Sequence, residues 1–455
     1  MSKRNFILLI IVLIIAIIGV FGFLYLRPGT NAPVGDNSGT NFVAPFNSFG
    51  NSKPTSPVTK TPVNVSTGTS LPATETPVMK LTKISSMPIA GFTVFSKERL
   101  KDVPVPAPTS GGVGVPTANV GIVTKKTTTK PTPPPTEFAP ALRYVDTATG
   151  NIYETFADKI NEQKFSTTII PKVYDSYFSN NGESVVMRYL KSDDKTIETF
   201  VGVLPKELLG GDTTGNNEIK GSFLPDDVKD ISVSPDNSKI FYLFESANGS
   251  DNSMIGVTLN LLNNKKVQIF DSPFTEWLSQ WPMNNAITLS TKPSANIPGY
   301  MYNMDGAGKN LSQVLGNVNG LTTLTSPNGK LILYGDNNLS LYIYHTDTRN
   351  SDVLGIKTLP EKCVWGNASD TIYCAVPKSV DAGGYPDTWY QGEVSFNDQI
   401  WKIDVKTGNA TLIIDPTTVG SGEEVDGIKL SLDAGENYLF FVNKKDSFLW
   451  KLSLK

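Results

Sequence analysis

The chain is poor in the residues that most enzymes use for acid–base and metal chemistry. Its 455 residues include one histidine, His345, and two cysteines, Cys363 and Cys374. Ser-His-Asp and Cys-His catalytic systems need a base beside the nucleophile, but His345 lies in the alternating pattern LYIYHTDT, which is typical of a histidine held within a strand. No HExxH, CxxC or EF-hand motif occurs, so neither a metal site nor a cofactor is predicted.

An excess of charge of one sign is also missing. The chain has 40 lysines and arginines against 43 acidic residues, a formal net charge of −3. No basic stripe with interleaved aromatic residues occurs, so nucleic acid is not predicted as a partner. Beyond residue 138 the arginines are Arg143, Arg188 and Arg349, and the segment SLDAGENYL lacks the Thr-Trp end of the sialidase box. The arginine-rich sites of propeller glycosidases are therefore not indicated.

Long hydrophobic runs are absent with one exception, Phe6–Leu26. These 21 residues carry no charge, and as a helix they would span roughly 30 Å, the thickness of a bilayer core. Lys3 and Arg4 precede the run, which favours a cytoplasmic N-terminus and export of the remainder to the periplasm or cell surface. The competing interpretation is a cleaved signal peptide, whose apolar region is shorter, about 7–15 residues. We predict an uncleaved transmembrane signal anchor at 1–27.

Two stretches of low complexity follow the anchor. Residues 28–78 are rich in Pro, Thr and Ser and have too few apolar side chains to offset the entropy lost on ordering, so they are predicted to form a flexible linker. A similar stretch at about 103–137 predicts a disordered insertion within a domain that spans 79–455. Between the two stretches lies a short strand-like island at 79–100.

Repeated hairpins organise the rest of the chain. One recurring unit places Asn, Asp, Gly or Pro at a tight bend before an apolar run, as in SPDNSKIFYLF from Ser234 and SPNGKLILYG from Ser326. A second hairpin recurs as YVDTATGNIYETF from Tyr144 and WKIDVKTGNATLII from Trp401. Two hairpins make a four-stranded unit, and a period of roughly 40–65 residues is typical of the blades of a β-propeller. We predict an all-β fold with seven blades, with six or eight as alternatives.

The end of the chain predicts how the ring closes. The last segment, IKLSLDAGENYLFFVNKKDSFLWKLSLK, supplies only three strands. An open sheet edge invites aggregation, and propellers avoid one by completing a blade with strands from both ends of the chain. We therefore expect Lys80–Ser85 to pair beside Phe448–Leu454.

The SPDNSK and SPNGK turns resemble the short repeats of WD40-like and TolB-type propellers. The segments RYVDTATGNIYE and CVWGNASDTIYCAVP resemble motifs of uncharacterised membrane-anchored propellers from candidate-phyla bacteria. The resemblance implies a propeller fold and an extracytoplasmic location. It implies no activity.

Two features are candidates for a structural or functional role. Cys363 and Cys374 flank a predicted hairpin, which favours a disulfide outside the cytoplasm, with two buried thiols as the alternative. The long loop Val380–Ser395 carries Tyr385, Trp389 and Tyr390. These amphipathic aromatics are candidates for a binding hot spot on a propeller face, and the alternative is a plug that folds them back over the blade.

These observations lead to two functional hypotheses. The first is a non-enzymatic binding or scaffolding propeller whose partner is a protein or a cell-envelope glycan. The alternative is a carbohydrate-active or peptidase-like enzyme that uses carboxylates near the propeller axis.

Overall fold

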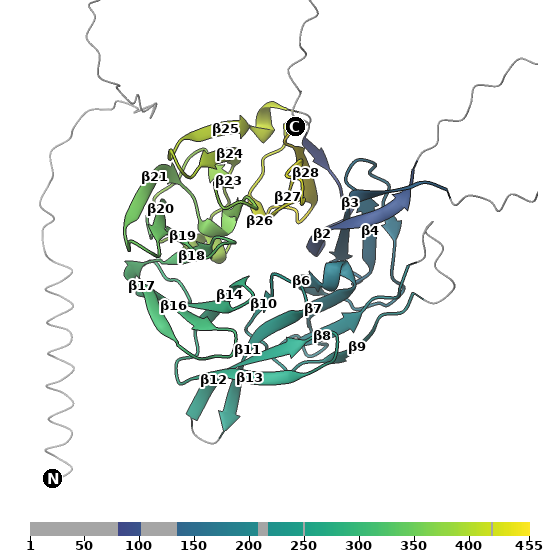
Figure 1. Ribbon diagram of the computed structural model, residues 1–455, viewed down its shortest axis with the longest axis horizontal. Helices are drawn as coiled ribbons and strands as arrows, with labels where there is room; N and C mark the ends of the chain where they lie inside the picture. Colours follow the sequence, from purple (N-terminus) through teal and green to yellow (C-terminus); the bar gives the residue numbers. More distant parts are fainter. Residues whose placement is uncertain (1–80, 102–133, 208–216, 249–250, 420–421) are drawn as a thin grey trace, which may run out of the picture. The chain divides into compact units, whose positions relative to one another are not determined.

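The computed structural model describes residues 81–101, 134–207, 217–248, 251–419 and 422–455. Within these ranges the strands form seven separate sheets of four strands each. Figure 1 shows the sheets arranged as blades around a common axis. The predicted all-β propeller and its seven blades are confirmed.

Six blades are each built from four consecutive strands in antiparallel order. Blades 1 to 3 comprise β2 (Ile89–Leu100), β3 (Thr136–Asp146), β4 (Ile152–Phe156) and β5 (Gln163–Lys164); β6 (Val173–Ser179), β7 (Ser184–Leu190), β8 (Ile197–Val203) and β9 (Lys220–Phe223); β10 (Asp230–Val233), β11 (Lys239–Asn248), β12 (Asp251–Asn260) and β13 (Lys266–Ser272). Blades 4 to 6 comprise β14 (Trp277–Met283), β15 (Ala286–Thr291), β16 (Pro298–Asp305) and β17 (Ser312–Asn319); β18 (Thr322–Thr325), β19 (Leu331–Gly335), β20 (Ser340–His345) and β21 (Ser351–Lys357); β22 (Cys363–Trp365), β23 (Thr371–Pro377), β24 (Asp398–Asp404) and β25 (Ala410–Ile414).

Blade 7 closes the ring with strands from two distant parts of the chain. It contains β26 (Gly427–Leu432), β27 (Tyr438–Asn443) and β28 (Leu449–Ser453), and its fourth strand is β1 (Leu81–Lys83). Leu81 pairs with Leu452, and the backbone of Ile84 continues the ladder by donating to the Leu449 carbonyl over 2.7 Å. The predicted pairing of Lys80–Ser85 with the last strand is confirmed for its described residues.

The core lies between blades. The second strand of each blade faces a neighbouring sheet on both sides, which explains continuous apolar runs such as Leu439–Val442 of β27, all buried. One cluster joins Phe241 and Leu243 of blade 3 to Trp277 and Ile287 of blade 4. Stability therefore comes from stacking sheets face to face.

The short turns have the conformation that the SPDNSK and SPNGK motifs predict. Asn237 and Gly329 occupy the left-handed positions of the SPDNSK and SPNGK turns, with φ of 56° and 68°. The Ser326 backbone N–H donates to the Leu331 carbonyl over 2.9 Å, and the Asn328 side chain accepts from the Lys330 backbone N–H over 3.0 Å. Asn and Gly adopt this backbone conformation at low cost, so each turn residue suits its place.

Innermost strands of neighbouring blades approach closely at one glycine. A Cβ at Gly91 of β2 would lie 2.1 Å from the Ser176 carbonyl oxygen of β6. Only glycine allows the two backbones to meet there.

The island at 79–100 contributes strands to two blades, since β1 belongs to blade 7 and β2 to blade 1. Strand β3 begins at Thr136, inside the stretch predicted as an insertion at about 103–137. The predicted anchor at 1–27 and linker at 28–78 lie outside the described residues. Among the residues within the described ranges, no helix has the length and apolar character needed to cross a membrane.

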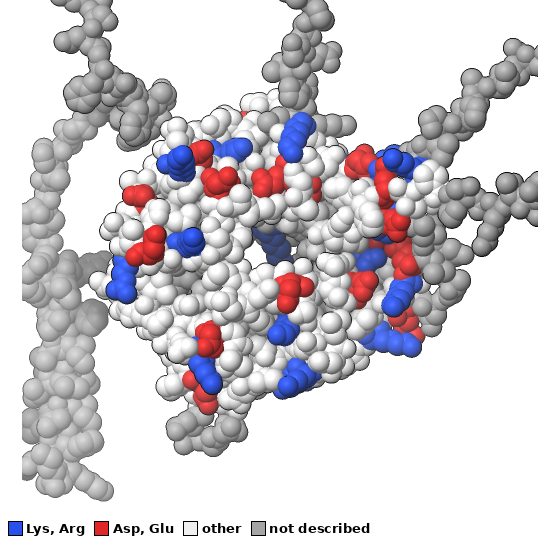
Figure 2. Space-filling view, viewed as in Figure 1, with Lys and Arg blue, Asp and Glu red and all other residues white. Residues whose placement is uncertain are grey.

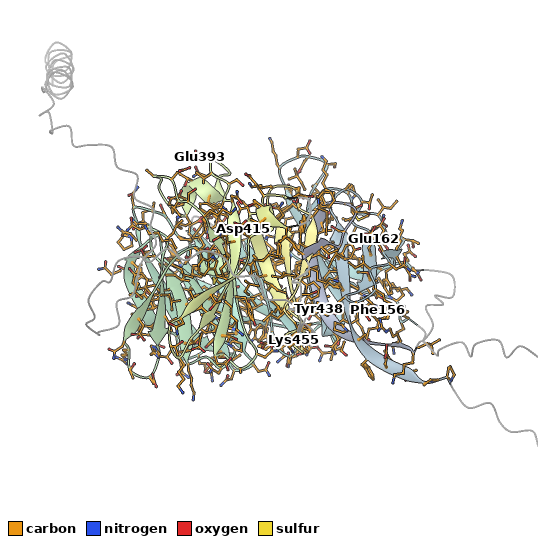
Figure 3. All side chains as sticks on the ribbon, turned by 90° about the horizontal axis from the view of Figure 1, so that it is seen from above. Phe156, Glu162, Glu393, Asp415, Tyr438 and Lys455 are labelled. Carbon is orange, nitrogen blue, oxygen red and sulfur yellow. A yellow bond between two sulfur atoms is a disulfide. The ribbon has the colours of Figure 1, made fainter. Side chains whose placement is uncertain are left out.

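The propeller is a disc with two distinct faces. Figure 3 shows it from the side, with Glu393 at one face and Lys455 at the other. In the view of Figure 2, side chains of both signs are interspersed around a hollow near the centre of the face.

Candidate functional site

The aromatic loop Val380–Ser395 lies between β23 and β24 of blade 6, and it contains the short helix α2 (Asp387–Tyr390). Tyr385 and Trp389 are only 2% and 4% exposed, and they pack with Phe396 in one apolar cluster. Tyr390 is 39% exposed. The loop is thus a plug, which was the alternative to a binding surface. Of the three predicted binding residues, only Tyr390 is accessible, and its role in binding stays a prediction.

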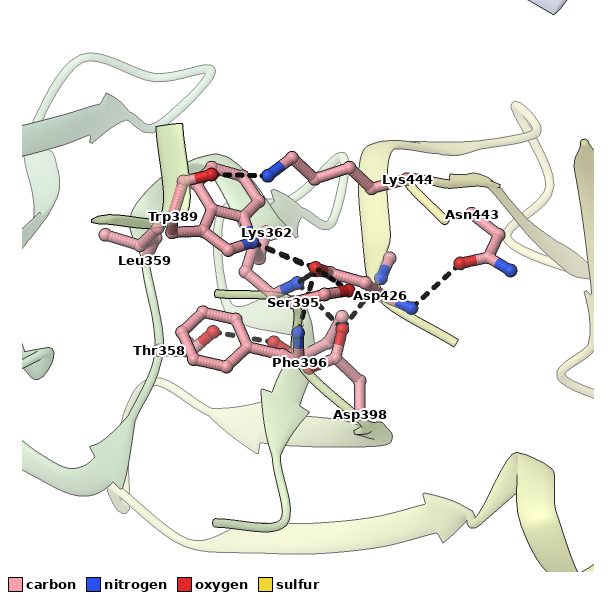
Figure 4. A network of polar contacts seen from close by, with 12 residues as sticks. Thr358, Leu359, Lys362, Trp389, Ser395, Phe396, Asp398, Asp426, Asn443 and Lys444 are labelled. Carbon is pink, nitrogen blue, oxygen red and sulfur yellow. Dashed lines mark hydrogen bonds and ion pairs between the residues drawn. The ribbon is translucent and has the colours of Figure 1, made fainter. Parts of the chain in front are cut away.

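The plug covers a buried ionic network, drawn in Figure 4. The Lys362 ammonium, at the end of the 3-10 turn η2 (Pro360–Lys362), contacts the carboxylates of both Asp398 and Asp426. The Nζ–Oδ2 distance to Asp398 is 2.7 Å, and all three side chains are fully buried. Asp398 begins β24 and Asp426 directly precedes β26, so the network joins blade 6 to blade 7.

Residues of the plug, and Phe396 directly after it, donate to the Asp426 carboxylate. Asp426 Oδ2 accepts from Trp389 Nε1 over 3.0 Å, from the Phe396 backbone N–H over 3.0 Å and from Ser395 Oγ over 3.2 Å. Lys444 Nζ lies over the indole, 4.2 Å from the Trp389 ring centroid. The buried indole N–H therefore has a partner, which is why this tryptophan points inward.

The two carboxylates that share the Lys362 ammonium have pKa values shifted in opposite directions. Burial raises the pKa of Asp398 to about 6, against the opposing pull of Lys362. For Asp426 burial also acts upward, but the Lys362 charge and the plug donors outweigh it and lower the pKa. Asp398 is therefore the first of the pair to take up a proton as the pH falls.

At the outer edge of the plug, the Tyr390 hydroxyl donates to the Glu361 carboxylate. Burial is the main cause that raises the pKa of Glu361, although Tyr390 and Lys362 act against it. Burial also raises the pKa of Tyr390 far above its ordinary range, reinforced by the Glu361 charge. The pair fastens the plug and leaves part of the Tyr390 ring at the surface.

A second charged cluster joins the inner strands near the axis. Asp175 of β6 pairs with Lys429 of β26 over 2.7 Å and with Arg188 of β7 over 3.4 Å. Lys429 Nζ also donates to the Ala90 carbonyl over 2.7 Å, and Arg188 donates to the Val228 carbonyl over 2.6 Å. Blades 1, 2, 3 and 7 are linked through these contacts.

Asp230 of β10 is the other acid of this axial cluster. Its Oδ2 accepts from Ser279 Oγ of β14 over 2.7 Å, which links blade 3 to blade 4. Burial raises the pKa of Asp230, whereas the charges of Lys429 and Arg188 hold the pKa of Asp175 low in spite of burial. The axial charges thus serve as contacts between blades.

The predicted disulfide between Cys363 and Cys374 is confirmed. The two residues are directly opposite each other in the β22–β23 pair. His345 pairs with Asp352 at the surface, with 3.0 Å between Nε2 and Oδ2. Within the described ranges, no group of three or more His, Cys, Asp or Glu side chains has an arrangement that would hold a metal ion.

Lys362, Asp398 and Asp426 are not among the site residues predicted from the sequence. Lys362 stands in LPEKCVW, directly before a buried strand, where an ammonium needs a nearby counter-charge. That position is the only sequence signal for the network, and it does not name the partners.

The chain matches no family model and no curated protein. Its fold is similar to that of an oligogalacturonate lyase from Vibrio parahaemolyticus, with 7% identity, a TM-score of 0.45, and coverage of 69% of this chain and 86% of that one. An oligogalacturonate lyase in complex with manganese aligns at 10% identity with a TM-score of 0.45, covering 69% of this chain and 85% of the other. A chain of the mitotic checkpoint complex aligns at 12% identity with a TM-score of 0.42, covering 69% and 84%. Similarity this low says nothing about the activity of this chain.

Proposed function

We propose that the chain is a non-enzymatic binding or scaffolding propeller, tethered to the membrane by Phe6–Leu26 and displayed outside the cytoplasm. Its partner is a protein or a cell-envelope glycan. A single membrane pass and a long linker, both inferred from the sequence, connect the propeller to the membrane.

The engagement of the charged groups supports binding over catalysis. Asp175, Arg188 and Lys429 hold one another, and Asp230 is held by Ser279. A general acid or base has to reach the substrate with its proton-transferring atom. Groups already used to join blades are poorly suited to that task.

The disulfide supports the location. Cys363 and Cys374 are oxidised, and such bonds persist in compartments outside the cytoplasm. A hairpin closed by a disulfide stabilises the fold, as expected for a binding module outside the cytoplasm.

Site-specific photocrosslinking in native membranes tests the binding function. A photoreactive phenylalanine analogue at position 390 replaces a 39% exposed aromatic, and the same analogue at Val353, 66% exposed on the outer strand β21, serves as the control. We expect a discrete adduct from position 390 and none from position 353. Equal adducts at both positions, or no adduct at position 390, would contradict a binding role for the surface around Tyr390.

The alternative, an enzyme using axial carboxylates, has one observation in its favour. Asp230 has a raised pKa caused by burial and lies within the axial cluster. If the chain is an enzyme, Asp230→Asn should abolish turnover of a cell-wall glycan or peptide while the fold is retained.

A further inference from the structure

The hairpin turn between the third and fourth strands carries an unusual residue in blade 5. In blades 3, 4 and 6 the left-handed position of this turn is occupied by Asn264, Gly308 and Gly408, with φ of 57°, 78° and 70°. In blade 5 the same position is Arg349, with φ of 60°. Asparagine and glycine tolerate this backbone conformation, whereas an arginine there is strained. The corresponding turns of blades 3, 4 and 6 avoid this backbone strain. Its presence in blade 5 therefore suggests that the Arg349 side chain has a function.

Arg349 lines a pocket of about 390 Å³ between blades 4 and 5. Met283, Met301 and Ile332 supply apolar surface, and Asn303 and Gln313 supply amides. Arg349 is the only charged residue of the lining. Because alternate connections of an antiparallel blade lie at opposite ends, this pocket opens on the face away from the plug.

Several polar side chains of the pocket lining are without partners among the described residues, although the Thr346 hydroxyl donates to the Lys330 carbonyl over 3.1 Å. Within the part of the chain that the structure describes, no residue forms an ion pair or a hydrogen bond with the Arg349 guanidinium or with the side-chain amides of Asn303 and Gln313. Thr325, also in the lining, is 8% exposed, and its hydroxyl is buried without a partner among the described residues. Because this hydroxyl is closed to solvent, the polar groups that can reach a ligand are those of Arg349, Asn303 and Gln313.

Gly329 shapes the wall of the same pocket. Its φ is 68°, and a Cβ there would lie 2.2 Å from the Met283 methyl carbon. The SPNGK turn of blade 5 thus leaves room for the Met283 side chain from blade 4. The pocket is built from turns of both blades.

We propose that this pocket binds a carboxylate-bearing ligand. The Arg349 guanidinium pairs with the carboxylate through its planar fork, and the side-chain amides of Asn303 and Gln313 donate to the ligand oxygens. The methionine side chains pack against the ligand body. A single cation matches a monoanion, so a carboxylate is favoured over a doubly charged phosphate. This inference adds a second binding site, on the face opposite the plug, to the proposed binding function.

Methionine methyl NMR of the full chain in detergent micelles tests the proposal. The ε-methyl groups of Met283 and Met301 report directly on the pocket. The probes are N-acetyl-Ala-Ala-Ala with its C-terminal amide as the neutral control, and glucuronate with glucose as its control. We expect an acid, but not its neutral counterpart, to shift these two signals. The acid that binds identifies the source of the carboxylate as a peptide terminus or a sugar acid.

Three variants separate binding from stability. Arg349→Gly should weaken acid binding at least tenfold and leave the melting temperature equal or higher, because glycine suits the left-handed turn. Gln313→Leu should weaken binding several-fold without loss of stability, since this amide has no partner among the described residues. Lys309→Gln removes an exposed cation from the corresponding turn of blade 4 and should leave binding unchanged.

The proposal is overturned if neutral probes shift the signals as much as the acids, if inorganic phosphate binds more tightly than either acid, or if Arg349→Gly binds normally. Any of these results with an intact crosslink from position 390 would refute the pocket and leave the proposed binding function standing.

Discussion

Removing the buried ammonium under the plug should destabilise the propeller strongly. Lys362→Met keeps most of the side-chain volume but leaves Asp398 and Asp426 facing each other without a cation, in a site that is fully buried. Breaking a buried ion pair from one side costs about 3–5 kcal/mol. In a domain of this size such a loss corresponds to a fall of roughly 4–7 °C in melting temperature.

Asp398→Asn should behave in the opposite way. The pKa of Asp398 is raised from its ordinary 3.8 to about 6, so its ionisation at pH 7 weakens the folded state, on the order of 2–3 kcal/mol. The variant removes that charge, leaves Lys362 paired with Asp426, and retains an oxygen that accepts from the Gly427 backbone N–H. At pH 7 we expect its melting temperature to be equal to or above that of the wild type.

The raised pKa of Asp398 makes the stability of the folded state depend on pH. The folded state binds a proton at Asp398 below about pH 6, whereas the unfolded chain does so only near 3.8. The contribution of this group to stability therefore rises as the pH falls from 7 towards 4, and Asp398→Asn should remove that rise. Differential scanning fluorimetry from pH 4.5 to 7.5 measures all three proteins. Equal destabilisation by Lys362→Met and Asp398→Asn would refute this account of the network.

Three further results are expected. Cys363→Ser with Cys374→Ser opens a hairpin closed across a sequence separation of 11 and should cost about 2–3 kcal/mol in denaturant, unless mass spectrometry of the wild type finds free thiols. Ile84→Asp places a charge at a buried position beside the closing strand, and hydrogen exchange at Leu449–Ser453 should then accelerate; unchanged protection would contradict closure by β1. Gly91→Ala should lower the melting temperature by several degrees, because its Cβ would lie 2.1 Å from the Ser176 carbonyl oxygen, and a wild-type value would show that β2 and β6 can separate.

The fold was predictable because its signals are local. Bends such as SPNGK specify a hairpin within a few residues, and Gly329 occupies the left-handed position that the turn requires. Ring closure followed from counting, since the last segment supplied three strands and one strand was left over near residue 81. Without that pairing, the last blade would have kept an open sheet edge.

The candidate site was less predictable because its contacts are distant in sequence. The aromatic residues of the loop were visible, but their direction depends on Asp426, which is 37 residues beyond Trp389 and 64 beyond Lys362. No local pattern connects these positions. Burial of Trp389 follows only once blade 7 brings the carboxylate beneath the indole.

The Arg349 pocket could not be predicted from the sequence either. The HTDTRN turn reads as an ordinary bend, and the strain at Arg349 becomes apparent only when its φ is compared with that of Gly408. The side-chain amide of Gln313, which lines the same pocket, comes from β17 of blade 4.

Closure of blade 7 by β1 and β28 also affects when the protein can fold. The partner of Leu81–Lys83 is the segment Leu449–Ser453, so during synthesis the first described strand waits for the last one to emerge. Until then every nascent chain carries an open ring with exposed sheet edges. A product cut short by premature termination lacks the closing partner and keeps those edges, which makes completeness of the chain a condition for escaping proteolysis.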